Sequence, residues 1–563
     1  MPAHGSTTES SDYWPADTGF EVEQEVRDPV ELTVTGTIPS YVAGTLYRTG
    51  PRGSHRVDTE KGGTFALHHW FDGFTQNHRF QIIPSKDGPT RVLYNSRSGV
   101  DPLIEDIRKT GQIERFTFGQ KRDPCTSIFR KILGVFIPPK EYVNPNIGVT
   151  LAVNPPGLYS TVTSSSTESS GVSEQGSRTG LQTLWAKTDA DIYGQFDPET
   201  LEPIGYAHQS VLHPSLRGPL SGAHAKSDPV TRDVYNFNLE LGRPPTYRIF
   251  CVSADTGRTD IIATVTDAPS AYMHSILLTK SYVVLCVWNA HYAWGGLKLL
   301  WERNVMDAIS SFDPTRSALW YVIDRINDKG VVAKFESDPF FCFHTINAWE
   351  EPSSTHPSEI DIVADLSIYE NLDILNRLYY ENLLSTPRSS EDFVGEKRET
   401  SRPMLRRFRL HSILSRSVSQ PGVAVEEFTA PKDHSCDLPT VNPRTLTNPS
   451  RYIYGVTDRG KSTIWDGLVK YNTYTREPRF WFHHGQNPGE PIFIADPDGE
   501  NEDDGVLLSV VLDGLKGRSF LLVLDANKME ELGRASMECA VGFGFHGLYA
   551  SSSSSSGIPV LEV

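Results

Sequence analysis

The chain has 563 residues, of which 38% are hydrophobic and 10% aromatic, so it can bury a large core. Its formal net charge of −17 argues against a nucleic-acid partner, because a phosphate backbone needs a basic surface to replace its counterions. The six cysteines form no CxxC pair, which predicts reduced thiols in a cytoplasmic protein rather than a disulfide framework.

The chain begins with a polar stretch rich in Ser, Thr, Asp and Glu. Residues 1–20 are therefore predicted to be a disordered tail, and they lack the apolar segment of a secretory signal. Residues 21–563 are expected to form a single domain with loop insertions near 160–180 and 385–402, where low-complexity sequence interrupts the strand pattern. The longest apolar run, Tyr282–Trp288, is too short to span a bilayer.

Short runs of strand-forming residues alternate with turn sequences from Val30 onward. Turns are predicted at 197–200 (DPET), 228–231 (DPVT) and 254–257 (ADTG), and again at Asp525. Regular hairpins over such a length predict an all-β fold, either a β-propeller or a large sandwich. We favour the propeller, because its distant strands can send side chains to one common axis.

Helix-forming sequence is scarce. The best candidate is Asp365–Leu384, where Leu and Tyr recur at helical spacing behind Asp365 as a candidate N-cap. We expect this helix to belong to a helical and loop cap that covers one face of the propeller.

A second unusual stretch is residues 128–137, where apolar side chains lie beside Arg130 and Lys131, with Lys140 just beyond. Apolar anchors with flanking cations suit a segment that lies in a membrane interface. Peripheral attachment to a membrane is therefore expected here, and a strand with a loop of the propeller core is the alternative.

Four histidines stand in similar surroundings, each in or at the end of a predicted strand, beside small or apolar residues. They are His224, His274, His344 and His546. A lone buried histidine is more often a satisfied core residue than a metal ligand. Because the four share their context, we predict that they converge on one metal ion. The glycines of Gly542–Gly547 are expected to let the backbone approach the axis and to let His546 point inward.

Seven motifs lead to a known family over nearly the whole chain, from about Val30 to Val563. They are Tyr47–Pro51 (YRTGP), His69–Phe74 (HWFDGF), Gly222–Pro229 (GAHAKSDP), Tyr272–Ser275 (YMHS), Phe343–Glu350 (FHTINAWE), Glu502–Asp513 (EDDGVLLSVVLD) and Phe545–Tyr549 (FHGLY). With these motifs the chain resembles the carotenoid cleavage oxygenase family, and within it the fungal torulene-cleaving type. The resemblance implies a seven-bladed β-propeller with Fe(2+) on its axis, held by His224, His274, His344 and His546.

The resemblance also implies carboxylates behind the ligands, because three glutamates hold three of the histidines in this family. Glu490 matches one of them, whereas Asp189 and Asp437 occupy the other two positions. Aspartate is one methylene shorter, so either the backbone moves inward or a water bridges the gap; both could instead be turn residues. Val149 or Thr150 matches the small side chain that partly covers the iron.

The implied activity is oxidative cleavage of one double bond of a carotenoid or apocarotenoid, with a torulene-like polyene favoured. The partners would be a lipophilic polyene and dioxygen, and both products would be carbonyl compounds. Cleavage of β-carotene to retinal is one alternative, and stilbene cleavage, which needs a Tyr–Lys pair on the phenol hydroxyl, is another. A propeller without metal that serves as an interaction scaffold is the alternative from a different class, and metal analysis would distinguish it.

Overall fold

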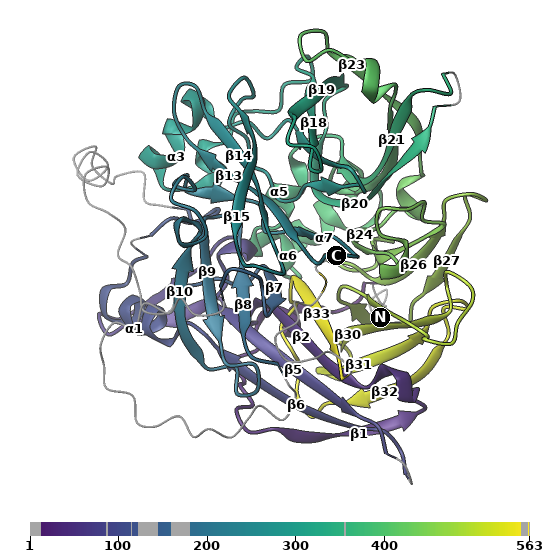
Figure 1. The fold of residues 1–563 in the computed structure, drawn as a ribbon. Helices are drawn as coiled ribbons and strands as arrows, with labels where there is room; N and C mark the ends of the chain where they lie inside the picture. Colours follow the sequence, from purple (N-terminus) through teal and green to yellow (C-terminus); the bar gives the residue numbers. More distant parts are fainter. Residues whose placement is uncertain are drawn as a thin grey trace, which may run out of the picture.

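The computed structural model describes residues 13–85, 88–113, 115–121, 145–158, 181–353, 356–552 and 561. Nearly all of its regular structure is antiparallel β-sheet, so the expected all-β fold is confirmed. Figure 1 shows the sheets following one another around the molecule in chain order, with the yellow C-terminal strands beside the purple N-terminal ones.

The largest sheet joins the two ends of the chain. Its order is β28-β30-β31-β32-β1-β6-β5-β2-β33, with β29 paired to β30. The last strand, β33, therefore pairs with β2, and His546 lies opposite Thr49. The strands are β1 (Val30–Gly36), β2 (Gly44–Pro51), β5 (Thr75–Ile83), β6 (Arg91–Ser98), β28 (Gln486–Pro488), β29 (Ile492–Ala495), β30 (Gly505–Asp513), β31 (Arg518–Asp525), β32 (Glu531–Ser536) and β33 (His546–Ser551).

Three smaller sheets also place consecutive strands side by side. Their orders are β10-β9-β8-β7, β11-β13-β14-β15 (β12 also pairs with β13) and β24-β25-β26-β27. Their strands are β7 (Thr150–Val153), β8 (Leu184–Lys187), β9 (Ile192–Phe196), β10 (Pro203–His208), β11 (Leu220–Ser221), β12 (Lys226–Ser227), β13 (Val234–Glu240), β14 (Thr246–Val252), β15 (Thr259–Val265), β24 (Asp437–Thr440), β25 (Tyr452–Thr457), β26 (Gly467–Asn472) and β27 (Pro478–Trp481).

An eight-stranded sheet has the order β16-β17-β18-β19-β23-β22-β21-β20, and β3 (Arg56–Asp58) pairs separately with β4 (Thr64–Ala66). Its strands are β16 (Leu277–Leu278), β17 (Tyr282–Val287), β18 (Ala318–Asp324), β19 (Gly330–Ser337), β20 (Phe341–Pro352), β21 (Ile360–Tyr369), β22 (Met404–Leu410) and β23 (Gly422–Thr429).

The predicted turns lie between paired strands, as expected. The turns at 197–200 and 228–231 have the same construction, in which the first aspartate accepts hydrogen bonds from the two backbone N–H groups that lie two and three residues further on. The turn at 254–257 joins β14 to β15, and Asp525 ends β31. Local turn chemistry therefore fixes the hairpin spacing.

The predicted helix Asp365–Leu384 is wrong in its first part. Residues up to Tyr369 belong to strand β21, and helix begins only at Asp373. Asp365 caps no helix; its buried carboxylate receives two hydrogen bonds from Arg407 of the neighbouring strand, at 2.7 and 2.8 Å. Because β21 is buried along almost its whole length, its apolar residues show no alternation and imitate helical spacing.

The helices are short, and several of them lie near the centre of the view in Figure 1. Among the described residues, none is long and apolar enough to cross a membrane. The α-helices in the described part of the chain are α1 (Asp101–Thr110), α3 (Leu297–Glu302), α4 (Val305–Ala308), α5 (Asp373–Arg377), α6 (Tyr380–Leu383) and α7 (Pro387–Phe393).

Two boundary predictions need correction. The described end of the predicted tail, from Tyr13, is packed: Trp14 and Phe20 are buried, and Phe20 contacts the rings of Trp70 and Phe543. Two aromatic anchors thus outweigh the polar composition around them. The insertion at 385–402 forms α7 and a 3-10 helix (Gly395–Ser401) instead of an exposed loop, because its Thr and Ser residues cap the helix. The stretches 128–137 and 160–180 lie outside the described residues.

Candidate metal centre

The four predicted histidines come from four separate parts of the sheet system. His224 lies between β11 and β12, His274 between β15 and β16, His344 within β20, and His546 begins β33. One ring nitrogen from each lies within 4.8 Å of those of the others. His546 Nε2 is 3.0 Å from His224 Nε2 and 3.3 Å from His344 Nε2. The structure therefore brings all four together at one point.

Local irregularities in the strands aim two of these rings inward. The pairing of β20 with β21 shifts register between Cys342 and His344, and such bulges re-aim side chains next to sites. Before β33, the glycines of Gly542–Gly547 allow close backbone approach, since a Cβ on Gly542 would lie 2.7 Å from the backbone nitrogen of Gly53. The close backbone approach that these glycines were expected to allow is therefore present at Gly542.

Three carboxylates contact three of the imidazoles directly. His274 Nδ1 is 2.8 Å from Asp189 Oδ1, and His344 Nδ1 is 2.6 Å from Asp437 Oδ1. His546 Nδ1 is 2.7 Å from Glu490 Oε1. The aspartates therefore reach their histidines without a bridging water, and neither is simply a turn residue.

His224 is held differently. Among the described residues, no carboxylate contacts its ring; instead its backbone N–H donates to the carbonyl of His274, and the segment pairs with Ser275. Burial lowers the pKa of His224 and of His546 well below the usual histidine value, and the neighbouring imidazoles act in the same direction. Both rings are therefore neutral at physiological pH.

The tautomers follow from these contacts. A carboxylate accepts the proton on Nδ1, so Nε2 of His344 and of His546 carries a lone pair rather than a hydrogen. These two nitrogen atoms lie 3.3 Å apart. Because each presents a lone pair to the other, they cannot form a hydrogen bond and they repel each other. Converging neutral imidazole lone pairs form a donor set that fits a transition-metal cation.

Glu490 has two hydrogen-bonding partners besides His546. Its second oxygen accepts hydrogen bonds from Arg48 Nη1 at 2.7 Å and from the backbone N–H of Gly547, also at 2.7 Å. Burial raises the pKa of Glu490 to about 7, and Arg48 opposes that rise. The buried guanidinium therefore favours the ionised form of this carboxyl behind His546.

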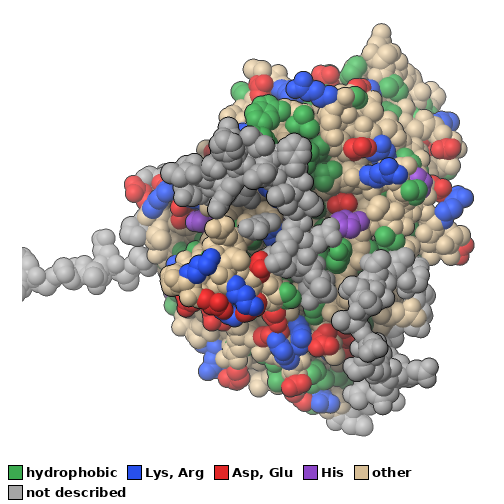
Figure 2. All heavy atoms as spheres, turned by 90° about the vertical axis from the view of Figure 1, so that its left-hand side faces the viewer, with side chains coloured by type: hydrophobic (Ala, Val, Ile, Leu, Met, Phe, Trp, Pro, Cys, Tyr) green, Lys and Arg blue, Asp and Glu red, His purple; other side chains and the backbone are tan. Residues whose placement is uncertain are grey.

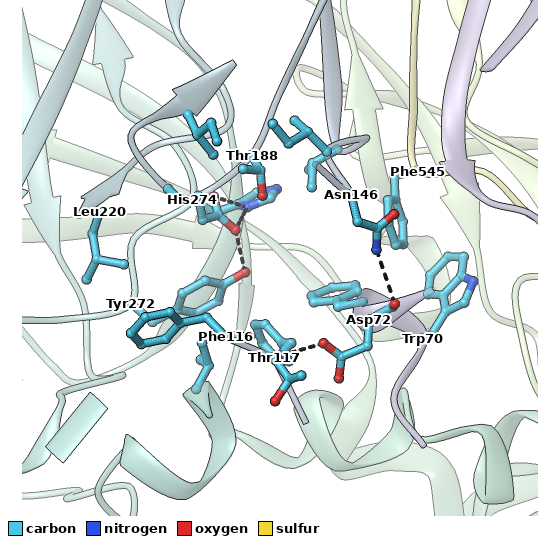
Figure 3. A pocket seen from close by; sticks show the side chains of 18 of the residues that line it. Trp70, Asp72, Phe116, Thr117, Asn146, Thr188, Leu220, Tyr272, His274 and Phe545 are labelled. Atoms are coloured by element: carbon cyan, nitrogen blue, oxygen red, sulfur yellow. Dashed lines mark hydrogen bonds and ion pairs between the residues drawn. The ribbon is translucent and has the colours of Figure 1, made fainter. Parts of the chain in front are cut away.

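A cavity of about 440 Å³ opens beside the histidines. Its lining is mainly apolar, with residues of α3, α4 and α5 on one side, and Figure 3 shows Trp70, Tyr272 and Phe545 around its interior. Val149 lines this cavity, whereas Thr150 lines a smaller one of about 170 Å³ and donates to the carbonyl of Ala223. Of the two candidates for the small side chain beside the metal, Val149 is therefore the one that faces the larger cavity.

Three groups at the site were not singled out from the sequence. Arg48 lies in the YRTGP motif, and Tyr272 lies two residues before His274 in YMHS, so motif membership was an available signal. Tyr369, whose hydroxyl is 2.5 Å from Asp437 Oδ2, lies at the end of β21 and carries no such signal.

Buried imidazoles backed by carboxylates beside an apolar cavity define a non-haem metalloenzyme for a hydrophobic substrate. The family model described as "Retinal pigment epithelial membrane protein" matches residues 19–551, so the chain belongs to this family, the carotenoid cleavage oxygenases. The family depends on non-haem iron, and its members named below are enzymes.

Two curated relatives and one solved structure show the extent of the similarity. The chain is 42% identical to a carotenoid dioxygenase of Neurospora crassa over 562 residues, covering 96% of this chain and 91% of that protein. It is also 42% identical to a torulene dioxygenase of Gibberella fujikuroi over 552 residues, covering 96% and 94%. An apocarotenoid oxygenase of Synechocystis superposes with a TM-score of 0.71 at 20% identity, covering 96% and 99%.

Proposed function

We propose that this protein is an Fe(2+)-dependent dioxygenase that cleaves one double bond of a carotenoid or apocarotenoid to two carbonyl products, with a torulene-like polyene as the favoured substrate. One observation carries the proposal: four imidazoles converge beside a mainly apolar cavity. Bound there, iron would supply the binding and activation of dioxygen.

His224, His274, His344 and His546 would hold the iron as neutral ligands, which leaves the ion its full charge. Asp189, Asp437 and Glu490 would fix the orientation of three of the rings through their Nδ1 protons. The surrounding aromatic side chains exclude water from the reacting double bond. Regiochemistry would follow from how far a rigid polyene can slide along the cavity.

The lining and the relatives favour a polyene over the alternatives. The torulene dioxygenase is 42% identical to this chain, whereas a β-carotene dioxygenase of Mus musculus is 28% identical. A stilbene enzyme would need a lysine beside a tyrosine at the phenol hydroxyl, and no lysine is among the described residues that line the cavity. We therefore rank torulene-like substrates first and β-carotene second.

The proposal is tested by loading the purified protein anaerobically with Fe(2+) and then incubating it in air with torulene, β-carotene and resveratrol. We expect about one equivalent of iron and cleavage of torulene to two aldehydes or ketones that each carry label from isotopic dioxygen. Retention of less than about half an equivalent of iron would support a scaffold instead. Cleavage of resveratrol alone would reverse the ranking of substrates.

The sheets are consistent with seven blades around one axis. The ten-stranded sheet can be divided between β32 and β1 into a β28–β32 group and a group of β1, β6, β5, β2 and β33. The eight-stranded sheet can be divided between β19 and β23 into β16–β19 and β20–β23. With the three smaller sheets these groups give seven, and we propose that they are the blades.

We also propose that the protein takes its substrate from a lipid surface through an apolar patch near the cavity. Trp294, Leu297 and Leu300 are exposed on the segment that includes α3, and Leu300 also lines the cavity. Figure 2 shows hydrophobic side chains gathered on the upper part of the face that carries α3. A polyene could therefore pass from the acyl chains of a bilayer into the cavity without entering water.

Replacing Trp294 and Leu297 together by serine is expected to weaken binding to phosphatidylcholine vesicles at least about tenfold, because each large apolar side chain is worth about 1.5–3 kcal/mol on burial. Co-sedimentation measures the effect. The matched control is the double serine variant of Val230 and Ile326, which are exposed elsewhere and line a different hollow. Equal vesicle binding by the two double variants would remove the patch from the proposal.

A further inference from the structure

The two aspartates behind the histidines share a feature that Glu490 lacks: each has a tyrosine hydroxyl hydrogen-bonded to its Oδ2 atom. Tyr272 donates to Asp189 Oδ2 at 2.9 Å, and Tyr369 donates to Asp437 Oδ2 at 2.5 Å. Figure 3 shows the Tyr272 hydroxyl directed toward the carboxylate beside His274. Glu490, the longer carboxylate, is held by Arg48 and a backbone N–H instead.

We infer that Tyr272 and Tyr369 are positioning residues for the metal centre, because their hydroxyls lock the planes of the two short carboxylates that orient His274 and His344. This inference rests on the proposed metal site. The terminal torsion of an aspartate is broad, so a carboxylate that contacts only one histidine can rotate away from it. A second donor, the tyrosine hydroxyl on Oδ2, removes that freedom.

Asp189 shows how much one carboxylate can organise. Its two oxygens lie 2.8 and 2.9 Å from His274 Nδ1, and Oδ1 also accepts from the backbone N–H of Ala223 at 3.1 Å. Ala223 immediately precedes His224, which has no carboxylate of its own among the described residues. Asp189, fixed by Tyr272, therefore connects the orientation of His274 to the backbone that carries His224.

Asp437 is fixed in an equivalent way. Its Oδ1 accepts from His344 and from the backbone N–H of Leu438, while Oδ2 accepts from Tyr369. Leu438 has φ of 46°, in the left-handed region that is costly for leucine, so the chain maintains local strain to turn Asp437 inward.

Tyr369 is the cleaner test of the inference, because it does not line the larger cavity. Its ring is fully buried and packs edge-on against Phe343 at a centroid distance of 5.8 Å. A change at its hydroxyl therefore leaves the substrate surface intact. Tyr272 does line the cavity, but replacement by phenylalanine keeps its ring there.

The test compares Tyr369→Phe and Tyr272→Phe with Tyr454→Phe as the matched control. Tyr454 is equally buried, and its hydroxyl donates to the backbone carbonyl of Ala526 at 3.2 Å rather than to a carboxylate behind a histidine. Fe(2+) affinity is measured on the full-length protein by competition with a chelator. We expect about tenfold weaker affinity in each of the first two variants, the scale of an outer-shell loss, and less than a twofold change in the control.

Two further readouts separate positioning from a general loss of stability. Urea midpoints of the metal-free proteins are expected to fall by similar amounts in all three variants. The visible absorption of the Co(2+)-loaded protein is expected to shift in Tyr369→Phe and Tyr272→Phe only, because it reports ligand geometry. Tyr272→Phe should also keep the KM for the polyene within twofold.

The outcomes distinguish this inference from the function on which it rests. If the unaltered protein binds neither Fe(2+) nor Co(2+), the proposed metal site fails. If it binds them and both site variants match Tyr454→Phe in affinity and absorption, the metal site stands and the positioning role of the tyrosines is overturned.

Discussion

Replacement of His344 by alanine is expected to abolish polyene cleavage and to weaken iron binding at least about a hundredfold, while the protein still folds. His344 contributes one of four converging lone pairs, and its partner Asp437 would then face an empty position. Losing a ligand removes a metal bond, whereas losing an outer partner costs only about 10–100-fold. Metal content and turnover under saturating iron measure the two effects.

His69 is a matched control, because it is a buried histidine whose two ring nitrogens both have hydrogen-bond partners. Its Nε2 contacts the carbonyl of Leu375 at 2.9 Å, and its Nδ1 accepts from the backbone N–H of Phe71. His69→Ala is expected to lower the free energy of unfolding without changing the iron stoichiometry. Full iron content in His344→Ala, or loss of iron in both variants alike, would contradict the assignment of His344.

The second large effect is expected at Arg48, whose replacement by methionine should cost about 3 kcal/mol of unfolding free energy and weaken iron binding together. Both Arg48 and Glu490 are buried, so removing the guanidinium leaves a carboxylate without its charge partner. Because burial already raises the pKa of Glu490 to about 7, that carboxyl can take up a proton, which keeps the cost at the lower end of the range for a broken buried pair.

Urea unfolding and chelator competition measure these two consequences. Arg91→Met is the control, because Arg91 also forms a close ion pair, with Glu31, but both side chains are about half exposed. Such exposed surface pairs contribute little to stability, and this one involves none of the four histidines. If Arg48→Met loses no more stability than Arg91→Met, the buried pair does not hold Glu490 in place.

The four histidines could be predicted from the sequence because the residues that identify each of them lie next to it along the chain. Each histidine lies in a long motif, and the hairpin turns carry aspartates in fixed positions, so patterns along the chain were sufficient. The direct contact of Asp189 and Asp437 with their histidines could not be derived, since it depends on backbone placement such as the strained Leu438. Tyr369 was missed for a similar reason: only the pairing of β21 with β20 brings it to the site.

The false helix at Asp365 has a different cause. Strand β21 is hydrogen-bonded between β20 and β22, and nearly all of its residues are buried. A strand that is buried on both faces shows neither alternation nor polar stripes. The polar composition of the first residues also predicted disorder wrongly at Trp14 and Phe20. Two buried rings can hold a segment in place even when its other residues are polar.

The pairing of β33 with β2 has a consequence for biosynthesis. His546 is the last of the four histidines along the chain, so the ribosome synthesises it after the other three. A nascent or truncated polypeptide that has already assembled its other sheets would still be unable to retain iron firmly. Firm metal binding is therefore expected only after β33 has paired with β2.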